Sequence, residues 1–116
     1  QQMINFVYQD RRGRRGHHGV VITLHDEVYE RASVDLVCED KGIEICNVRA
    51  HYPRGKGYGT IIMKHIVEEF GTNELFLVCE PRLEGFYKRF GFKQIITTTT
   101  TSPHSLPMLT MEYHEK

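Results

Sequence analysis

Residues 54–59 read Arg54-Gly55-Lys56-Gly57-Tyr58-Gly59, a basic loop in which every second residue is glycine. When such a loop opens a helix, the first backbone N–H groups have no partner inside the helix and lie at the positive end of its dipole. Glycines let an anion approach these groups because they carry no side chain. The loop therefore predicts a site for an anion with at least two charges. An ordinary glycine-rich turn is the alternative interpretation.

An amphipathic helix is expected directly after this loop. Apolar or small residues recur at helical spacing, at Gly59, Ile62, Met63, Ile66, Val67 and Phe70. Gly71 is a suitable residue to end this helix. We therefore predict a helix that runs from the loop to about residue 71 and buries one face.

The strand before the loop contains an irregularity. Ile43 and Ile45 alternate with polar residues, as in a strand with one buried face. The alternation fails at Asn47-Val48, where the apolar side chain is out of step by one residue. We predict a bulge at this position.

The upstream part of the chain predicts an antiparallel meander. Apolar and β-branched runs at residues 3–8, 20–24 and 33–38 are typical of strands. A basic, glycine-rich connector joins the first two runs, and Asp40-Lys41-Gly42 predicts a hairpin turn into the strand that begins at Ile43.

The downstream part predicts a parallel central strand and a second helix. Residues 75–79 are apolar on both faces, which indicates a strand covered on both sides and paired in parallel with an earlier strand. A helix should begin at Pro81 and end at Gly91, followed by strands at 93–101 and 106–113. The expected fold class is α/β (α+β): a mixed, mostly antiparallel sheet of about six to seven strands, with two main helices and a parallel central pair.

Composition favours one cytoplasmic domain. A chain of 116 residues is expected to form a single domain over residues 1–116. Lys and Arg together number 15, as do Asp and Glu, so no overall charge attracts nucleic acid or a membrane. Three cysteines without a C-x-x-C pair fit a reducing compartment, which would be the cytoplasm, or the nucleus of a eukaryote. No metal site is predicted, because no cysteine has zinc-like spacing to His17 or His18.

Two motifs together resemble a known signature. The first is R-x-x-G-x-G opening a helix, and the second, after an apolar strand, is Phe86-Tyr87-Lys88-Arg89-Phe90-Gly91-Phe92. Their order and spacing resemble the GNAT superfamily of N-acetyltransferases, over residues from about 43 to 113. The resemblance implies a sheet whose fourth and fifth strands separate at a bulge, where the pantetheine arm of acetyl-CoA takes the place of a strand. It also implies direct acetyl transfer from acetyl-CoA to a primary amine in a ternary complex.

The resemblance assigns roles to particular residues. Backbone groups of Asn47, Val48 and Arg49 would pair with pantetheine, and N–H groups of the loop would bind the pyrophosphate. The residues expected to bind the coenzyme are Asn47, Val48, Arg49, Arg54, Gly55, Lys56, Gly57, Tyr58, Gly59 and Thr60.

Two residues are expected to take part in catalysis. Tyr87 matches a tyrosine that protonates the departing thiolate in many GNAT enzymes, and its alternative is a core residue of the helix. Glu44 resembles in placement a carboxylate base of some relatives, one residue short of their spacing, and its alternative is a solvent-facing strand residue.

The sequence departs from the superfamily in one respect that concerns the acceptor. GNAT enzymes usually have two helices between their first two strands, and only residues 9–19 separate the strands here. We expect the acceptor side to be open, formed by a partner such as a second copy, or supplied by residues absent from this chain. The amine acceptor is therefore unknown and includes peptides and proteins. The alternatives are a non-catalytic acetyl-CoA-binding or regulatory protein, and an RNA-binding module that uses the Arg11–Arg15 loop, although a solvated loop is the favoured interpretation there.

Overall fold

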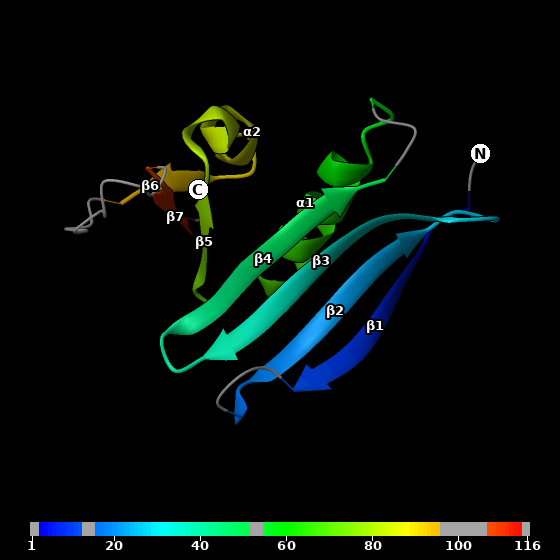
Figure 1. Cartoon of the computed structure of the whole chain (residues 1–116), viewed down its shortest axis with the longest axis horizontal. Coiled ribbons are helices and arrows are strands. Elements are labelled where there is room, and N and C mark those ends of the chain that lie inside the picture. Colours follow the sequence, from blue (N-terminus) through cyan, green and yellow to red (C-terminus); the bar gives the residue numbers. More distant parts are fainter. Residues whose placement is uncertain (1–2, 13–15, 52–54, 96–106, 115–116) are drawn as a thin grey trace.

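The computed structural model describes residues 3–12, 16–51, 55–95 and 107–114. Its strands form one sheet of seven strands in the order β1-β2-β3-β4-β5-β7-β6. Figure 1 shows the first four strands side by side, with β5, β7 and β6 continuing the sheet at one edge. The predicted mixed, mostly antiparallel sheet is confirmed.

The first half of the chain is the predicted antiparallel meander. It contains β1 (Asn5–Arg12), β2 (His18–His25), β3 (Glu30–Glu39) and β4 (Gly42–Ala50). Pairing between β1 and β2 extends to Arg12 and His18, so the strands run further into the basic connector than their apolar residues indicate. That leaves five residues between the two strands, too few for a helix pair.

A turn at Gly42 joins β3 to β4 and also contacts the next strand. Gly42 has φ +142°, and a Cβ at this position would lie 2.4 Å from the backbone oxygen of Glu74. The same oxygen accepts a 2.7 Å hydrogen bond from the backbone N–H of Ile43. Only glycine allows this approach without displacing the backbone of Glu74.

Helix α1 (Tyr58–Phe70) follows β4 and covers one face of the sheet. Its buried residues Ile62, Met63 and Ile66 belong to the same core cluster as Ile22 and Val34 from the sheet. The helix begins and ends within one residue of the prediction, because its apolar spacing and both flanking glycines are local signals.

Strand β5 (Leu75–Cys79) pairs in parallel with β4, as predicted, and antiparallel with β7 (Leu109–Tyr113). The expectation that β5 is covered on both sides is wrong. Leu75 and Leu77 are 1% exposed, whereas Val78 on the other face is 46% exposed. In the described part of the chain both helices pack on the same face, so the second face of β5 lacks a covering element.

The second helix is short and is preceded by a tighter turn. Its parts are the 3₁₀ helix η2 (Pro81–Leu83) and α2 (Glu84–Lys88), and Gly91, with φ +99°, follows them. Strand β6 (Phe92–Gln94) then pairs with β7 at the sheet edge. The predicted strands at 93–101 and 106–113 overlap β6 and β7, and residues 96–106 lie outside the described residues. None of the described helices is both long and apolar enough to cross a membrane.

Candidate functional site

Strands β4 and β5 pair over a short length and then separate. Parallel pairing joins Ile43–Ile45 to Leu75–Leu77, whereas β4 continues to Ala50. Figure 1 shows β5 turning away from β4 beyond this point. Within the described residues no strand pairs with this side of β4 after Ile45, so its backbone groups can bind an extended ligand there.

The separation coincides with the predicted bulge, which is confirmed. Asn47 has φ +49°, and the β3–β4 register shifts between Ser33 and Asp35. Asparagine tolerates this left-handed conformation better than most residues, and its side-chain N–H donates a 2.8 Å hydrogen bond to Asp35. The extra residue places Val48 against the core and leaves Arg49 exposed.

The loop before α1 has the backbone that an anion site requires. Gly55 and Gly57 have φ +84° and +79°, and a Cβ at either position would meet nothing within 4 Å. Gly57 caps the helix, and its carbonyl accepts the 3.0 Å hydrogen bond of Ile61. The N–H groups of Tyr58, Gly59 and Thr60 precede that bond, so they have no partner inside the helix.

A pocket of about 600 Å³ joins the end of β4, the glycine loop and α2. Its lining residues are Val48, Arg49, Ala50, His51, Gly55, Lys56, Gly57, Tyr58, Gly59, Thr60, Leu83, Phe86 and Tyr87. Nine of these were predicted as site residues from the sequence. Asn47 and Glu44 are outside the lining, and Arg54 lies outside the described residues.

The sequence did not identify Leu83 and Phe86 as pocket residues. Both belong to the apolar stripe of the second helix, which predicts burial rather than a site. The pocket forms because α2 approaches the start of α1, where a Cβ on Gly59 would lie 3.6 Å from the Phe86 ring. Sequence periodicity alone does not predict this long-range contact.

Tyr87 places a phenol in the pocket. Its ring is buried and packs edge-on against Phe86 at 5.1 Å and Phe92 at 6.2 Å between centroids. Every fully buried side-chain oxygen or nitrogen of the described residues has a hydrogen-bond partner, and the Tyr87 hydroxyl bonds to none of these residues. Tyr87 is one of the residues that line the pocket. Burial, with a smaller effect of Cys79, raises the pKa of Tyr87 to about 12.

This raised pKa predicts a loss of stability at alkaline pH. The folded Tyr87 keeps its proton up to about pH 12, whereas an unfolded tyrosine ionises near a pKa of about 10. Its contribution to the free energy of unfolding is therefore complete below about pH 10 and is lost as the pH rises towards 12. The free energy of unfolding, measured with a denaturant from pH 8 to 12, should show this alkaline loss in the wild type. The loss should be absent in Tyr87→Phe. An identical alkaline slope in both proteins would contradict the assignment.

An aromatic and ionic cluster supports the start of α1. The Arg31 guanidinium lies 5.0 Å from the ring centre of Tyr29 and 5.6 Å from that of Tyr58, the first residue of the helix. Asp26 pairs with Arg31 at 2.5 Å. Backbone hydrogen bonds from Tyr29 and Val28, followed by Arg31, lower the pKa of Asp26 to about 2. Because its carboxylate is held by these bonds, Asp26 is a structural residue rather than a base.

Glu44 lies away from this pocket. It is half-buried and belongs to the face of β4 opposite Ile45, which is in the core. Its neighbour on that face is Cys46, whose pKa is raised to about 11 by burial and then by the charge of Glu44. Glu44 can therefore act only on a group that approaches from the open face.

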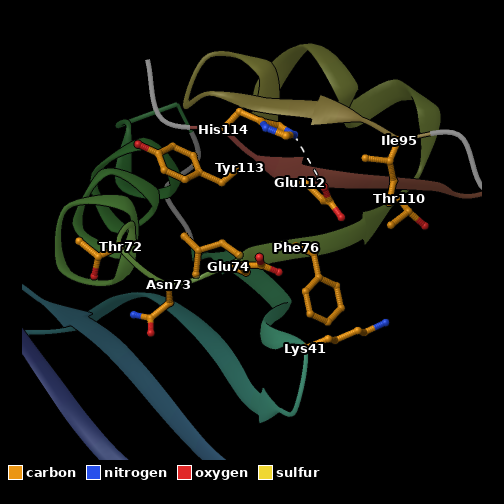
Figure 2. Close-up of a pocket in the computed structure, with 11 residues that line it drawn as sticks. Lys41, Thr72, Asn73, Glu74, Phe76, Ile95, Thr110, Glu112, Tyr113 and His114 are labelled. Atoms are coloured by element: carbon orange, nitrogen blue, oxygen red, sulfur yellow. Dashed lines mark ion pairs between the residues drawn. The ribbon is translucent and has the colours of Figure 1, made fainter.

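A separate pocket of about 320 Å³ lies between β5, β7 and the loop after α1. Figure 2 shows Lys41 extending beside Phe76, and the Lys41 Nζ atom is 4.6 Å from the centre of that ring. His114 and Glu112 form an ion pair at 3.7 Å in the same pocket. Lys41, Glu112 and His114 thus have partners within the pocket, and none of the motif residues lines it.

Several solved protein structures share the overall fold of this chain. Escherichia coli ElaA superposes with a TM-score of 0.68 at 18% identity, over 83% of this chain and 68% of that one. A GNAT-family protein from Bacteroides thetaiotaomicron gives 0.67 at 21% identity, over 89% and 65%. The chain has the GNAT fold. A Bacillus subtilis acetyltransferase in complex with CoA matches that fold over the whole of both chains, with a TM-score of 0.71 and 10% identity.

At the level of sequence, no protein-family model and no curated protein matches the chain. The GNAT fold is therefore shown by its three-dimensional arrangement. The chain spans 65% of the Bacteroides protein and 68% of ElaA, two GNAT-fold structures that are longer than it.

Proposed function

We propose that this chain is an acetyl-CoA-dependent N-acetyltransferase that moves an acetyl group to a primary amine by direct attack in a ternary complex. One observation carries the proposal: the unpaired edge of β4, the glycine loop at the start of α1, and Tyr87 line a single pocket. The GNAT fold and the CoA complex of a structural neighbour support it. We place the activity in the cytoplasm, because free cysteines suit a reducing compartment.

The chain's groups fit the coenzyme in two places. The N–H groups from Lys56 to Thr60 lie at the positive end of α1, where they would bind the pyrophosphate with Lys56 and Arg54 adding charge. The backbone of Asn47, Val48 and Arg49 continues along the unpaired edge of β4, where it would pair with the pantetheine amides.

Tyr87 would stabilise the departing sulfur. Acetyl-CoA supplies the acetyl group as a thioester, and the phenol donates a hydrogen bond towards the thiolate. A phenol with a pKa of about 12 facing a thiol with a pKa of about 8.5 makes complete proton transfer cost about 5 kcal/mol. Hydrogen-bond donation is therefore the larger part of its effect, and the thiolate takes its final proton from water.

Direct transfer fits the state of the cysteines near the site. Cys79 is 4% exposed, and burial raises its pKa. Cys46 has a pKa of about 11, so both side chains are thiols rather than nucleophilic thiolates near neutral pH. Glu44 is our proposed base for the amine, acting from the open face directly or through water.

Two measurements test the proposal. Acetyl-CoA at 100 times its Kd should stabilise the protein by about 2.7 kcal/mol, seen as a rise in melting temperature. Amine-dependent release of free thiol should accompany that binding. Absence of a melting shift at millimolar acetyl-CoA would overturn the coenzyme site, and binding without thiol release on any amine would favour a non-catalytic regulatory protein.

A further inference from the structure

The open face of the sheet carries a polar groove that the coenzyme site does not use. It has a volume of about 290 Å³ and crosses the strands from β1 to β4. Its lining residues are Gln9, Arg11, Val21, Thr23, Glu30, Ser33, Asp35, Asn47 and Arg49. Two of them, Val21 and Asp35, are paired across β2 and β3, which fixes the floor of the groove on rigid strands.

The groove ends at the bulge of β4. Asn47 and Arg49 line its end, and Arg49 also lines the coenzyme pocket on the other face. Beyond Ile45, β4 has no strand partner on its β5 side among the described residues. The two sites therefore meet where β4 has separated from β5.

The charged groups of the groove are incompletely paired. Neither Arg11 nor Arg49 forms an ion pair within the described part of the chain. Asp35 accepts one hydrogen bond from Asn47 through Oδ2, and Glu30 accepts one from His51 through Oε2, which leaves a second oxygen on each carboxylate. The groove thus offers two guanidinium groups and two carboxylate oxygens to a ligand.

We propose that this groove is the acceptor site and that it takes a small primary amine that also carries a carboxylate. This inference rests on the proposed function. The ammonium group would face Asp35 beside the bulge, and the carboxylate would face Arg11 and Arg49. A volume of about 290 Å³ is at the lower end of ligand pockets, which run from about 300 to 1,000 Å³ and suit larger molecules at their upper end. This volume favours an acceptor of amino-acid size.

The reaction balances without a further reactant. The ammonium first loses a proton to a carboxylate of the open face or to water. Its nitrogen then forms a bond with the acetyl carbon while the carbon–sulfur bond breaks and the sulfur keeps the electron pair. The remaining extra proton on nitrogen leaves to solvent, and the thiolate takes up one proton.

Matched small molecules test the groove directly. The full chain, labelled with ¹⁵N, is titrated with 4-aminobutyrate, butylamine and butyrate, and the series is repeated with glycine and β-alanine, each time with and without coenzyme A. At least one zwitterion should shift the backbone amides of Thr23, Ser33 and Asn47, and should saturate at a concentration at least about tenfold lower than either half-molecule. Equal binding of the halves, or shifts confined to other residues, would overturn the proposal.

Variants separate the groove from the coenzyme site. Arg11→Gln and Asp35→Asn should weaken binding of the zwitterion about tenfold, and the asparagine can still accept the hydrogen bond of Asn47. Arg12→Gln and Asp40→Asn, whose side chains do not line the groove, should leave it unchanged. If coenzyme A shifts the backbone amides at the start of α1 but no zwitterion binds, the acceptor site proposed here is overturned and the proposed function is not. Absence of those shifts would sink the proposed function, whatever binds the groove.

Discussion

Tyr87→Phe should lower kcat about 10- to 100-fold while changing the KM for acetyl-CoA by less than about threefold. A hydrogen bond to a charged group contributes about 1.5–3 kcal/mol, and the substitution removes only the hydroxyl that would donate it. The ring remains, so its packing against Phe86 and Phe92 is preserved. Steady-state kinetics by thiol release, together with coenzyme titration, measures both parameters.

Tyr113→Phe is the matched control. Tyr113 also packs against Phe92, at 5.6 Å between ring centroids, but it does not line the coenzyme pocket. Its loss of a hydroxyl should leave kcat within about twofold of the wild type, as expected for a side chain that does not touch the reacting atoms. If Tyr87→Phe keeps the full rate from pH 6 to 10, or if both variants lose activity equally, the phenol does not act on the leaving sulfur.

Gly42→Ala should produce the largest loss of stability. The new Cβ would lie 2.4 Å from the backbone oxygen of Glu74, and φ +142° is a conformation that side-chain-bearing residues rarely adopt. Overpacking costs about 1–3 kcal/mol and the backbone conformation about 1–3 kcal/mol more. The free energy of unfolding should therefore fall by about 2–6 kcal/mol, which lowers the melting temperature by about 8 °C or more in a domain of this size.

Gly16→Ala isolates the backbone contribution. Gly16 has φ +75°, and a Cβ there would meet nothing within 4 Å. Only the conformational cost applies, so this variant should lose about 1–2 kcal/mol. Urea unfolding at neutral pH compares the two proteins. Equal losses in both would show that the contact between Gly42 and Glu74 does not limit the packing of β4 against β5.

Features encoded within a few neighbouring residues could be predicted from the sequence. The bounds of α1 follow from an apolar stripe between two glycines, and the bulge at Asn47 follows from one break in alternation. The parallel partner of β5 was also predicted, because a fully apolar strand after a helix is typical of such a pair.

Features that depend on distant contacts could not be predicted in the same way. The exposure of Val78 depends on which face the helices cover, and apolar composition does not contain that information. The position of Glu44 opposite the coenzyme pocket depends on the strand's orientation relative to α1. The groove on the open face joins residues from four strands, so no local motif indicates it.

The extra residue at Asn47 changes which face of β4 each following side chain occupies, compared with an unbroken alternation. Upstream of it, Ile45 is in the core. Downstream, Val48 returns to the core and Arg49 to the open groove. If β4 kept all its residues but lost the bulge, strict alternation would exchange the two, placing a guanidinium among apolar side chains and a valine in the groove. The bulge, more than the identity of either neighbour, decides which side of the sheet each group serves.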